Sequence, residues 1–516
     1  MKRRDFIKTI AVSGTGAALT FNSIPFNAYG FNSVICKFIN PFIETDKVFV
    51  VIQLLGGNDG LNTVIPYQDS LYYTRRPVLG IPQNNVLPLP NSTMGLHPAL
   101  TEIKNLYTAN KIAIVQNVGY ANASLSHFRA TDIWHTASNS NQYFTTGWLG
   151  RYLKEEYPNF PNVLPPDPMA IQIGVSASLS LMSQVGDMSL TFQDPNQFYQ
   201  LVQGASFNGY DRVKTLAGPE LDFARRVAAD SLQYATRVKQ ASDLGQNLAT
   251  YPPNNTLADQ LKIVARLIDG GLQTRIYVVT MSGFDTHTQQ LISHNTLLGR
   301  VNTAINAFYN DLFLNNISGR VVGMTLSEFG RRVAENGSAG TDHGTAAPMF
   351  LFGDLVNGGM YGNNPDLVNI VSGNLVFQYD YRRVYSSVLK QLFAATDPEL
   401  MNIFFQQFQT LPLIIPQQDN IKNKKPDKFS LSQNYPNPFN PSTEITYSLR
   451  RESNVSIKIY DASGREVQTL VNDRKPQGTY KVIFDATGKK NLSSGIYFYK
   501  LTADDFTDVK KMILVK

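Results

Sequence analysis

The chain has 516 residues, too many for one ordinary hydrophobic core, so its length predicts two or more folded units. Hydrophobic residues make up 43% and charged residues 17%, which excludes a disordered chain, and a formal charge of +6 is too small to indicate a nucleic-acid partner. Cys36 is the single cysteine, so disulfides within the chain and multi-cysteine metal clusters are excluded. Any metal must bind to His, Asp, Glu or hydroxyl ligands.

The N-terminus carries Arg3-Arg4 ahead of a mildly apolar stretch that ends near Phe21. This pattern resembles a twin-arginine export signal, and the stretch is shorter than the roughly 20 apolar residues that a spanning helix needs. We therefore expect residues 1–30 to be a signal peptide that the twin-arginine translocase recognises. The alternative is a short basic N-terminus of a cytoplasmic protein. No later segment approaches a spanning length, so we expect no transmembrane span in the mature protein.

Residues 45–410 alternate strand-like apolar runs with amphipathic helical stretches, which is typical of a mostly parallel sheet covered by helices on both faces. We expect an α/β domain here. The expected strands are Val48–Leu55, Ile112–Gln116, Ile276–Thr280, Val321–Leu326 and Met349–Phe352. The expected helices are Glu220–Lys239, Leu257–Ile268, Asn295–Leu312 and Arg382–Ala394.

Residues 411–428 contain three prolines and a run of lysines, a composition that predicts a solvated linker. From residue 429 the apolar period changes to two, and turn signals such as Ser463-Gly464 separate short runs. Residues 429–516 are therefore expected to form a small all-β, immunoglobulin-like sandwich. Its expected strands are Glu444–Leu449, Val455–Tyr460, Tyr480–Phe484, Ile496–Leu501 and Val509–Val515.

This last segment resembles the C-terminal sorting domain of type IX secretion. The resemblance rests on NYPNPFNP from Asn434, IYD from Ile459, GIYFY from Gly495 and the closing KKMILVK. It implies the type IX secretion machinery as a partner and delivery through the periplasm to the cell surface or the extracellular space. The alternative is a generic carbohydrate- or protein-binding sandwich.

Polar residues cluster after the expected strands, where open α/β sheets bind their ligands. Asp59 follows the first strand, Asp285 and His287 follow a later one, and Asp342-His343 precede the last. Each residue taken singly has a structural alternative, such as a turn or helix cap for Asp59. Two of only six histidines nevertheless lie within two residues of an aspartate in glycine-bearing loops, which favours a shared polar site.

The other histidines have different expectations. His97 and His135 are predicted to be structural, and His294 is either a further ligand or an ordinary helical residue.

The segment from Ser124 to Arg129 leads into a helical stretch. A hydroxyl at a helix N-terminus can be activated by a metal and by the local backbone amides. Ser126 is the preferred nucleophile, Ser124 is the alternative, and Arg129 is expected to hold an anionic oxygen.

Seven motifs together resemble the uncharacterised bacterial family called domain of unknown function 1501, over roughly residues 47–404. They are QLLGGNDGLNTVIPY, SHFRATDIW, GWLGRYL, GFDTH, SEFGRR, GTDHGTAAPMFLFG and YRRVYSSVL. The family looks like part of the alkaline phosphatase and sulfatase superfamily, so the resemblance implies an alkaline-phosphatase-like fold. It also implies two metal sites beside a Ser or Thr nucleophile that attacks phosphate or sulfate esters.

The resemblance carries over residue by residue. Asp59 matches the first-strand metal ligand, Asp342-His343 match the superfamily's Asp-His pair, and Asp285 with His287 match the other metal pair. The last two stand two residues apart instead of the usual four, and no histidine follows His343. One metal site would then be incomplete, liganded through His294 or Glu328, or absent.

These observations lead to one functional prediction with two alternatives. The chain is predicted to be an exported hydrolase of phosphate or sulfate esters that uses zinc, manganese, magnesium or calcium ions and an anionic ester substrate. Its predicted metal ligands are Asp59, Asp285, His287, Asp342 and His343, and its predicted catalytic residues are Ser126 and Arg129. The first alternative is a non-catalytic surface binding or scaffold protein that keeps the hydrolase fold. An exported oxidoreductase is disfavoured, because the sequence has no Rossmann glycine fingerprint, cysteine cluster or haem motif.

Overall fold

The computed structural model describes residues 46–415 except 162 and 205–232, and residues 429–515 except 435–436 and 488–491. It also describes two short paired strands, β1 (Ala17–Phe21) and β2 (Ile24–Ala28). The Arg3-Arg4 pair lies outside the described residues, so the export signal stays a prediction. The expected helix at 220–239 also lies outside them up to residue 232, and residues 233–244 are helical.

The chain divides into two compact units, Met1–Ile415 and Pro416–Lys516. The first unit contains a nine-stranded sheet among its described residues, with the order β11-β8-β12-β3-β13-β14-β7-β15 and with β16 also paired to β7. β14 is antiparallel to its neighbours and the other pairs are parallel, which confirms the expected mostly parallel α/β sheet. The strands are β3 (Val48–Leu54), β7 (Ile112–Gly119), β8 (Ala170–Ile173), β11 (Ser189–Phe192), β12 (Ile276–Met281), β13 (Val321–Leu326), β14 (Ala347–Phe352), β15 (Gly359–Tyr361) and β16 (Tyr379–Asp380).

Strand β3 shows why helices cover both faces of this sheet. All seven of its residues are buried, and successive side chains of a strand point to opposite faces. Val48, Val50 and Ile52 pack in one apolar cluster, whereas Phe49 and Val51 pack in another. A strand that buries apolar side chains on both faces therefore requires a helical layer on each side.

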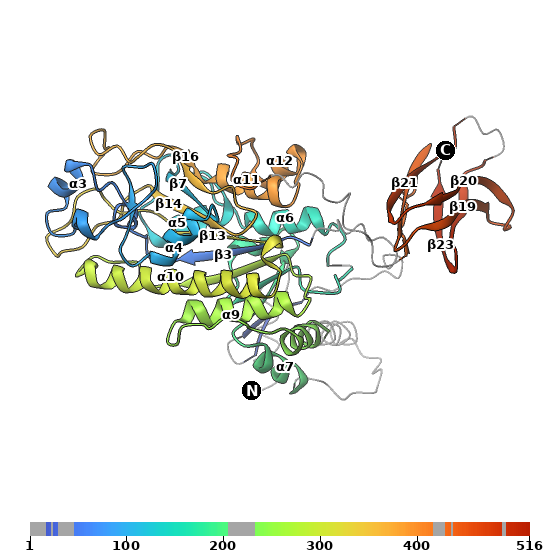
Figure 1. Ribbon diagram of the computed structural model, residues 1–516, viewed down its shortest axis with the longest axis horizontal. Helices are drawn as coiled ribbons and strands as arrows, with labels where there is room; N and C mark the ends of the chain where they lie inside the picture. The colour runs from blue at the N-terminus through green and yellow to red at the C-terminus, as the bar shows by residue number, and fades with distance from the viewer. Residues whose placement is uncertain are drawn as a thin grey trace. The chain divides into compact units, whose positions relative to one another are not determined.

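The two helical layers lie on opposite sides of the sheet (Figure 1). One layer is built from α4 (Thr101–Thr108), α9 (Thr256–Asp269) and α10 (Gln290–Leu314). The other is built from α5 (His127–Thr136), α6 (Trp148–Glu156), α11 (Tyr381–Leu392) and α12 (Asp397–Phe404). Side-chain caps set the starts of several helices. For example, Asn255 accepts a hydrogen bond from the Ala258 amide at the start of α9.

Parallel strands place their carboxyl ends at one edge of the sheet. The loops that follow β3, β7, β12 and β13 therefore meet at this edge. Because β14 is antiparallel to β13, the loop that enters β14 lies at the same edge. The fold thus brings together segments that are more than 200 residues apart in sequence, as shown by the 2.8 Å hydrogen bond from the Gly56 amide to Glu328 Oε1.

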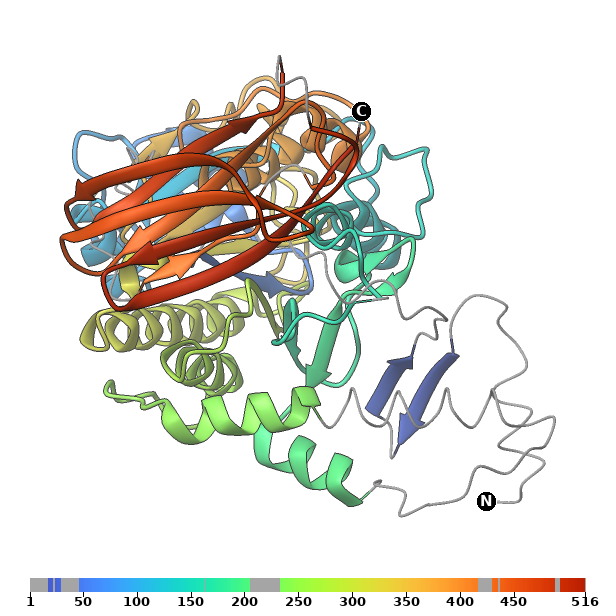
Figure 2. The same ribbon diagram turned by 90° about the vertical axis from the view of Figure 1, so that its right-hand side faces the viewer.

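The second unit has two antiparallel sheets, which confirms the expected all-β class. One contains β17 (Ser430–Leu431), β18 (Ser442–Leu449) and β21 (Gly478–Asp485), and the other contains β20 (Glu466–Lys475), β19 (Ser453–Asp461), β22 (Gly495–Ala503) and β23 (Phe506–Leu514). In Figure 2 the long strands of this unit face the viewer and lie side by side. The sequence did not predict β20, because none of its residues is buried and its apolar alternation is weak.

The chain stays packed on the first unit beyond the expected domain end at residue 410. Leu411, Leu413 and Ile414 are buried, and Ile414 pairs with Val356 in an isolated β-bridge. Residues 411–415 of the expected linker therefore belong to the first unit, because they are mostly apolar and join its core, and residues 416–428 lie outside the described part of the chain. Among the described helices, none is both long enough and apolar enough to span a bilayer.

Candidate functional site

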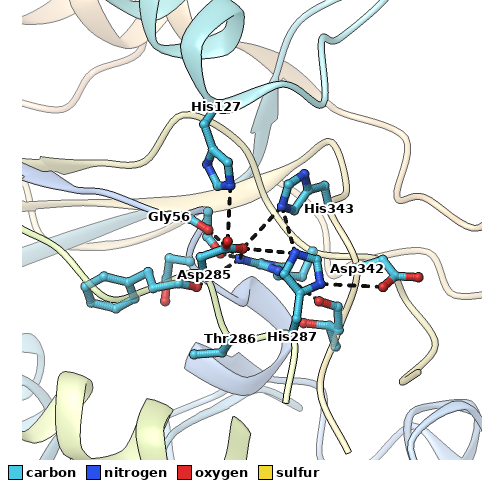
Figure 3. A network of polar contacts seen from close by, with 12 residues as sticks. Gly56, His127, Asp285, Thr286, His287, Asp342 and His343 are labelled. Atoms are coloured by element: carbon cyan, nitrogen blue, oxygen red, sulfur yellow. Dashed lines mark hydrogen bonds and ion pairs between the residues drawn. The ribbon is translucent and has the colours of Figure 1, made fainter. Parts of the chain in front are cut away.

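Three histidine side chains converge on one carboxylate at the carboxyl edge of the large sheet (Figure 3). His127 is the first residue of α5, Asp285 and His287 lie in the loop after β12, and His343 lies in the loop before β14. His287 Nε2 is 3.0 Å and His343 Nε2 is 3.2 Å from Asp285 Oδ1, and His127 Nε2 is 3.4 Å from Asp285 Oδ2. We call these four residues the Asp285 cluster.

The other ring nitrogen of each histidine faces an acceptor. His127 Nδ1 is 2.8 Å from Glu328 Oε1, and His343 Nδ1 is 2.7 Å from the Leu125 carbonyl oxygen. His287 Nδ1 is 3.6 Å from Asp342 Oδ1. Carboxylates and carbonyls only accept hydrogen bonds, so a neutral His127 or His343 donates from Nδ1 and keeps the lone pair on Nε2. This arrangement, in which outer acceptors orient the rings, is typical of metal-binding histidines.

The charge distribution within the cluster calls for a cation. His287 Nε2 lies 3.0 Å from His343 Nε2, and both nitrogens face the Asp285 carboxylate. Lone pairs and a negative charge at these distances repel one another unless a proton or metal ion lies among them. Ligand atoms of His127, Asp285 and His343 all lie within 4.8 Å of one another, so one ion can reach all three. The donor set therefore fits a divalent metal.

Arg331 keeps the central carboxylate ionised. Its Nη2 is 2.6 Å from Asp285 Oδ1, and the rest of the guanidinium donates to the carbonyls of Gly56, Gly57, Thr341 and Phe284. Burial raises the pKa of Asp285, but the hydrogen bond from Arg331, the contact with His343 and the Arg331 charge outweigh it and lower the pKa to about 2. Because the Arg331 side chain is fully buried, it organises the loops and is not offered to a ligand.

Glu328 connects the first strand to the cluster. Its buried carboxylate accepts hydrogen bonds from the Gly56 amide and from His127. Gly56 has a φ of +121°, and a Cβ there would lie 2.3 Å from the Asp285 amide nitrogen, so only glycine fits. The glycine-rich turn that the sequence showed therefore serves the close approach of two loops.

Asp59, which the sequence predicts as a metal ligand, does not join the Asp285 cluster. Its side chain is fully buried and forms a 2.6 Å ion pair with Arg76 Nη1, and Gln290 also donates to it. Burial raises the pKa of Asp59, but the charge and hydrogen bond of Arg76 outweigh it, so the pKa is lowered. The Arg76 guanidinium is thus the counter-charge of this carboxylate.

His294 and Asp342 lie outside the group of side chains that contact Asp285. His294 is buried, and its Nε2 is 2.9 Å from Asn58 Oδ1, so it does not replace a ligand of the cluster. Asp342 lies on the outer side of His287, as an acceptor for Nδ1. Glu328 has the same outer position relative to His127.

The predicted nucleophile is exposed and next to the cluster. Ser126 is the N-cap residue of α5, and its side chain makes no capping hydrogen bond. The residue before Ser126 is Leu125, whose carbonyl oxygen contacts His343. The residue after it is His127, which belongs to the cluster. Ser126 therefore lies between two residues that contact the cluster or belong to it.

Arg129 serves a neighbouring loop instead of the cluster. Its Nη2 donates to the Ser140 carbonyl oxygen at 3.1 Å and to the Gln142 carbonyl oxygen, and its guanidinium carbon lies 3.8 Å from the centre of the Tyr143 ring. The prediction that Arg129 holds an anionic oxygen therefore has no support in its position.

His127 is the residue that the sequence reasoning missed. The sequence favoured Ser126 as a nucleophile, whereas the histidine next to it is the residue that contacts Asp285 and Glu328. The available signal was that His127 follows a buried strand at the same sheet edge as His287 and His343.

Family comparison agrees with both resemblances. A family described as "Protein of unknown function (DUF1501)" matches residues 113–380, a shorter span than the expected 47–404. A "Secretion system C-terminal sorting domain" matches residues 433–516, which indicates export to the cell surface or extracellular space. No curated protein matches the chain.

Similar solved structures fall into two groups. A protein in the alkaline phosphatase superfamily from Vibrio parahaemolyticus is 9% identical, with 92% of each chain covered and a TM-score of 0.33. The PsFucS1 sulfatase from Pseudoalteromonas sp. is 10% identical, with 89% of this chain and 87% of that chain covered and a TM-score of 0.33. Latent PorU from Porphyromonas gingivalis is 22% identical over 17% of this chain, with a TM-score of 0.15. The chain spans only 9% of PorU and 12% of PorZ from the same organism.

Proposed function

The chain belongs to this DUF1501 family of unknown function, and we propose that it is an exported metal-dependent hydrolase of phosphate or sulfate esters. The observation that carries the proposal is the convergence of three histidine Nε2 atoms on Asp285, with the Nδ1 atoms facing fixed acceptors. A divalent ion held there would supply a Lewis acid toward an ester oxygen.

The residues of the cluster favour some ions over others. Three imidazoles and one carboxylate suit zinc or manganese, whereas magnesium and calcium prefer oxygen ligands. The side chains of Asp285 and His287 are 46% and 41% exposed, so a substrate can approach the cluster from solvent. Partial exposure distinguishes such a site from a closed structural metal site.

Ser126 is the residue that we propose to attack the ester. It is exposed, it caps α5, and it precedes the cluster residue His127. The free amides at the N-terminus of α5 would stabilise the developing negative charge, a role that Arg129 cannot take while it binds the 139–143 loop. The twin-arginine translocase is the proposed first export partner and the type IX machinery the second.

Metal analysis followed by an ester assay tests the proposal. Purified full-length protein is expected to contain stoichiometric zinc or manganese by mass spectrometry and to hydrolyse aryl phosphate or aryl sulfate. Asp285→Asn should lose the metal and the activity, whereas Asp366→Asn, which changes an exposed aspartate bound to Asn369, should retain both. Ser126→Ala should lose the activity and keep the metal, and Ser124→Ala should keep both.

Two results would overturn the proposal. Protein that holds no stoichiometric metal and hydrolyses neither ester with any added divalent ion contradicts it entirely. Protein that binds metal at the cluster without turnover of either ester supports the non-catalytic binding protein instead.

A further inference from the structure

A pocket of about 680 Å³ opens at the same sheet edge as the Asp285 cluster. Its walls come from the ends of β3, β8 and β12, from α5 and from the start of α9. Among the residues that the structure describes, Asp259 is the one charged residue of the lining, and no lysine or arginine lines the pocket. The pocket is therefore unsuited to an anion, unlike the neighbouring metal-binding cluster.

The pocket offers an unused hydrogen-bond acceptor. Gln172 is only 6% exposed, and its Oε1 is buried without a hydrogen-bond partner. A buried acceptor without a partner costs free energy, so such a group indicates a missing donor. The lining also offers the hydroxyls of Ser176 and Thr256, both exposed, and the half-buried hydroxyl of Thr131.

Other polar groups of the lining are already satisfied. Gln260 accepts from the Thr280 amide and donates to the Thr280 carbonyl, so it secures the end of β12. His135 Nε2 is 3.0 Å from Gln53 Oε1, and burial lowers the pKa of His135 to about 4, which leaves the ring neutral at pH 7. The free groups are therefore the Gln172 carbonyl, several hydroxyls and the Asp259 carboxylate.

Three elements connect this pocket to the cluster. His127, Thr131 and His135 follow one another at steps of four along α5, so they share one helix face. The helical rise places Thr131 only about 6 Å along the axis from His127. Leu55 of the pocket directly precedes Gly56, and Thr280 lies on the strand that leads to Asp285.

We propose that this pocket binds a neutral polyhydroxylated group of the sugar class. Hydroxyl groups would donate to Gln172 Oε1 and Asp259, and the apolar walls formed by Ile173 and Ile263 would contact the C–H face of the ring. If the proposed function holds, this group is the alcohol part of the ester whose anionic part lies at the Asp285 cluster. That last statement rests on the proposed function, whereas sugar binding does not.

Saturation-transfer NMR on the full-length protein tests the binding directly. The probes are neutral methyl glycosides of glucose, galactose, fucose and N-acetylglucosamine, with and without a chelator that removes metal. At least one glycoside is expected to bind under both conditions. Gln172→Leu should weaken its binding about tenfold, as expected for one lost hydrogen bond.

Gly174→Leu is the variant that should fill the pocket without disturbing the fold. A Cβ at Gly174 meets only the Gln172 side chain, at 3.8 and 3.9 Å, so the backbone accepts a side chain there. This variant should lose glycoside binding, and Gly319→Leu, at an exposed glycine with open space around it, should retain it.

The outcomes separate the two proposals. No binding of any glycoside, binding unchanged in Gly174→Leu, or displacement of the glycoside by inorganic sulfate or phosphate in metal-free protein would each overturn the pocket assignment. Glycoside binding that depends on Gly174 in a protein without esterase activity would support the pocket and contradict the proposed hydrolase.

Discussion

Asp59 and Asp285 follow neighbouring parallel strands, stand in glycine-rich loops and each bind one buried arginine at 2.6 Å, yet their surroundings differ completely. Asp59 is fully buried, with Arg76 as its counter-charge. Asp285 is 46% exposed and receives three imidazoles besides Arg331. The comparison shows that two strand-end aspartates with similar sequence contexts receive different neighbours. Asp59 receives Arg76 and Gln290, whereas three histidine rings besides Arg331 contact Asp285.

The largest expected effect concerns the buried ion pair of Asp59 and Arg76. Arg76→Met leaves the Asp59 carboxylate buried without its counter-charge, and it should lower the free energy of unfolding by about 3–5 kcal/mol. Denaturant unfolding measures the change. Arg75→Met, at the exposed neighbouring residue, serves as the control. Equal losses in the two variants would show that the buried pair contributes little.

The same comparison predicts that Asp59 and metal content are independent. Asp59→Asn should leave the bound metal unchanged, because Asp59 lies outside the cluster. Loss of the metal from folded Asp59→Asn protein would show that Asp59 is a metal ligand.

A substitution at His127 tests the partly exposed Asp285 cluster. His127→Gln removes one ring nitrogen from the cluster and should weaken metal binding by more than about 100-fold. This loss is larger than that expected when a residue that only orients a metal ligand is changed. Competition with a chelator measures the affinity. His135→Gln makes the same change two turns along α5, outside the cluster, and should keep the affinity. A similar loss in both variants would contradict the assignment of His127.

Glu328→Gln should have a smaller effect on the same affinity. The amide oxygen can still accept from Gly56 and His127, but the charge that increases the basicity of the imidazole is lost. We expect metal binding to weaken by about 10- to 100-fold. Glu155→Gln, at an exposed position, is the control. Unchanged affinity in Glu328→Gln would show that Glu328 only supports the loop.

The smallest effect is a pH dependence on the Asp59 side of the site. Burial lowers the pKa of His97 to about 3 and that of His294 to about 4. Between these values and the ordinary value near 6.5 the unfolded chain binds more protons, so stability falls as the pH falls. Acidification from pH 7.5 to 5.5 should cost about 1.4 kcal/mol for each histidine.

Unfolding of His97→Asn at both pH values checks the contribution of this residue. The asparagine oxygen can replace His97 Nδ1 as the acceptor for the Ala99 amide. The stability lost between pH 7.5 and 5.5 should then be smaller by about 1.4 kcal/mol, the contribution of one histidine. An unchanged pH dependence would contradict the assignment.

The sequence by itself determined much of the fold. The buried runs at Val48–Leu54 and Val321–Leu326 are almost entirely apolar and contain no charged residue, which favours interior strands of a sheet covered on both faces. The change of period after residue 429 likewise predicted the second, all-β unit. The weakly patterned β20 escaped prediction, because a strand without buried residues leaves no apolar alternation.

The sequence also named the loops of the site, but it could not assign partners. Asp285, His287 and His343 lie together in the structure, since all three follow or precede strands that end at one edge. The sequence assigned Asp59 to the metal and passed over His127, because the neighbours of each residue come from segments distant in the chain. Only the tertiary structure decided that Arg76 reaches Asp59 and that Glu328 turns His127 toward Asp285.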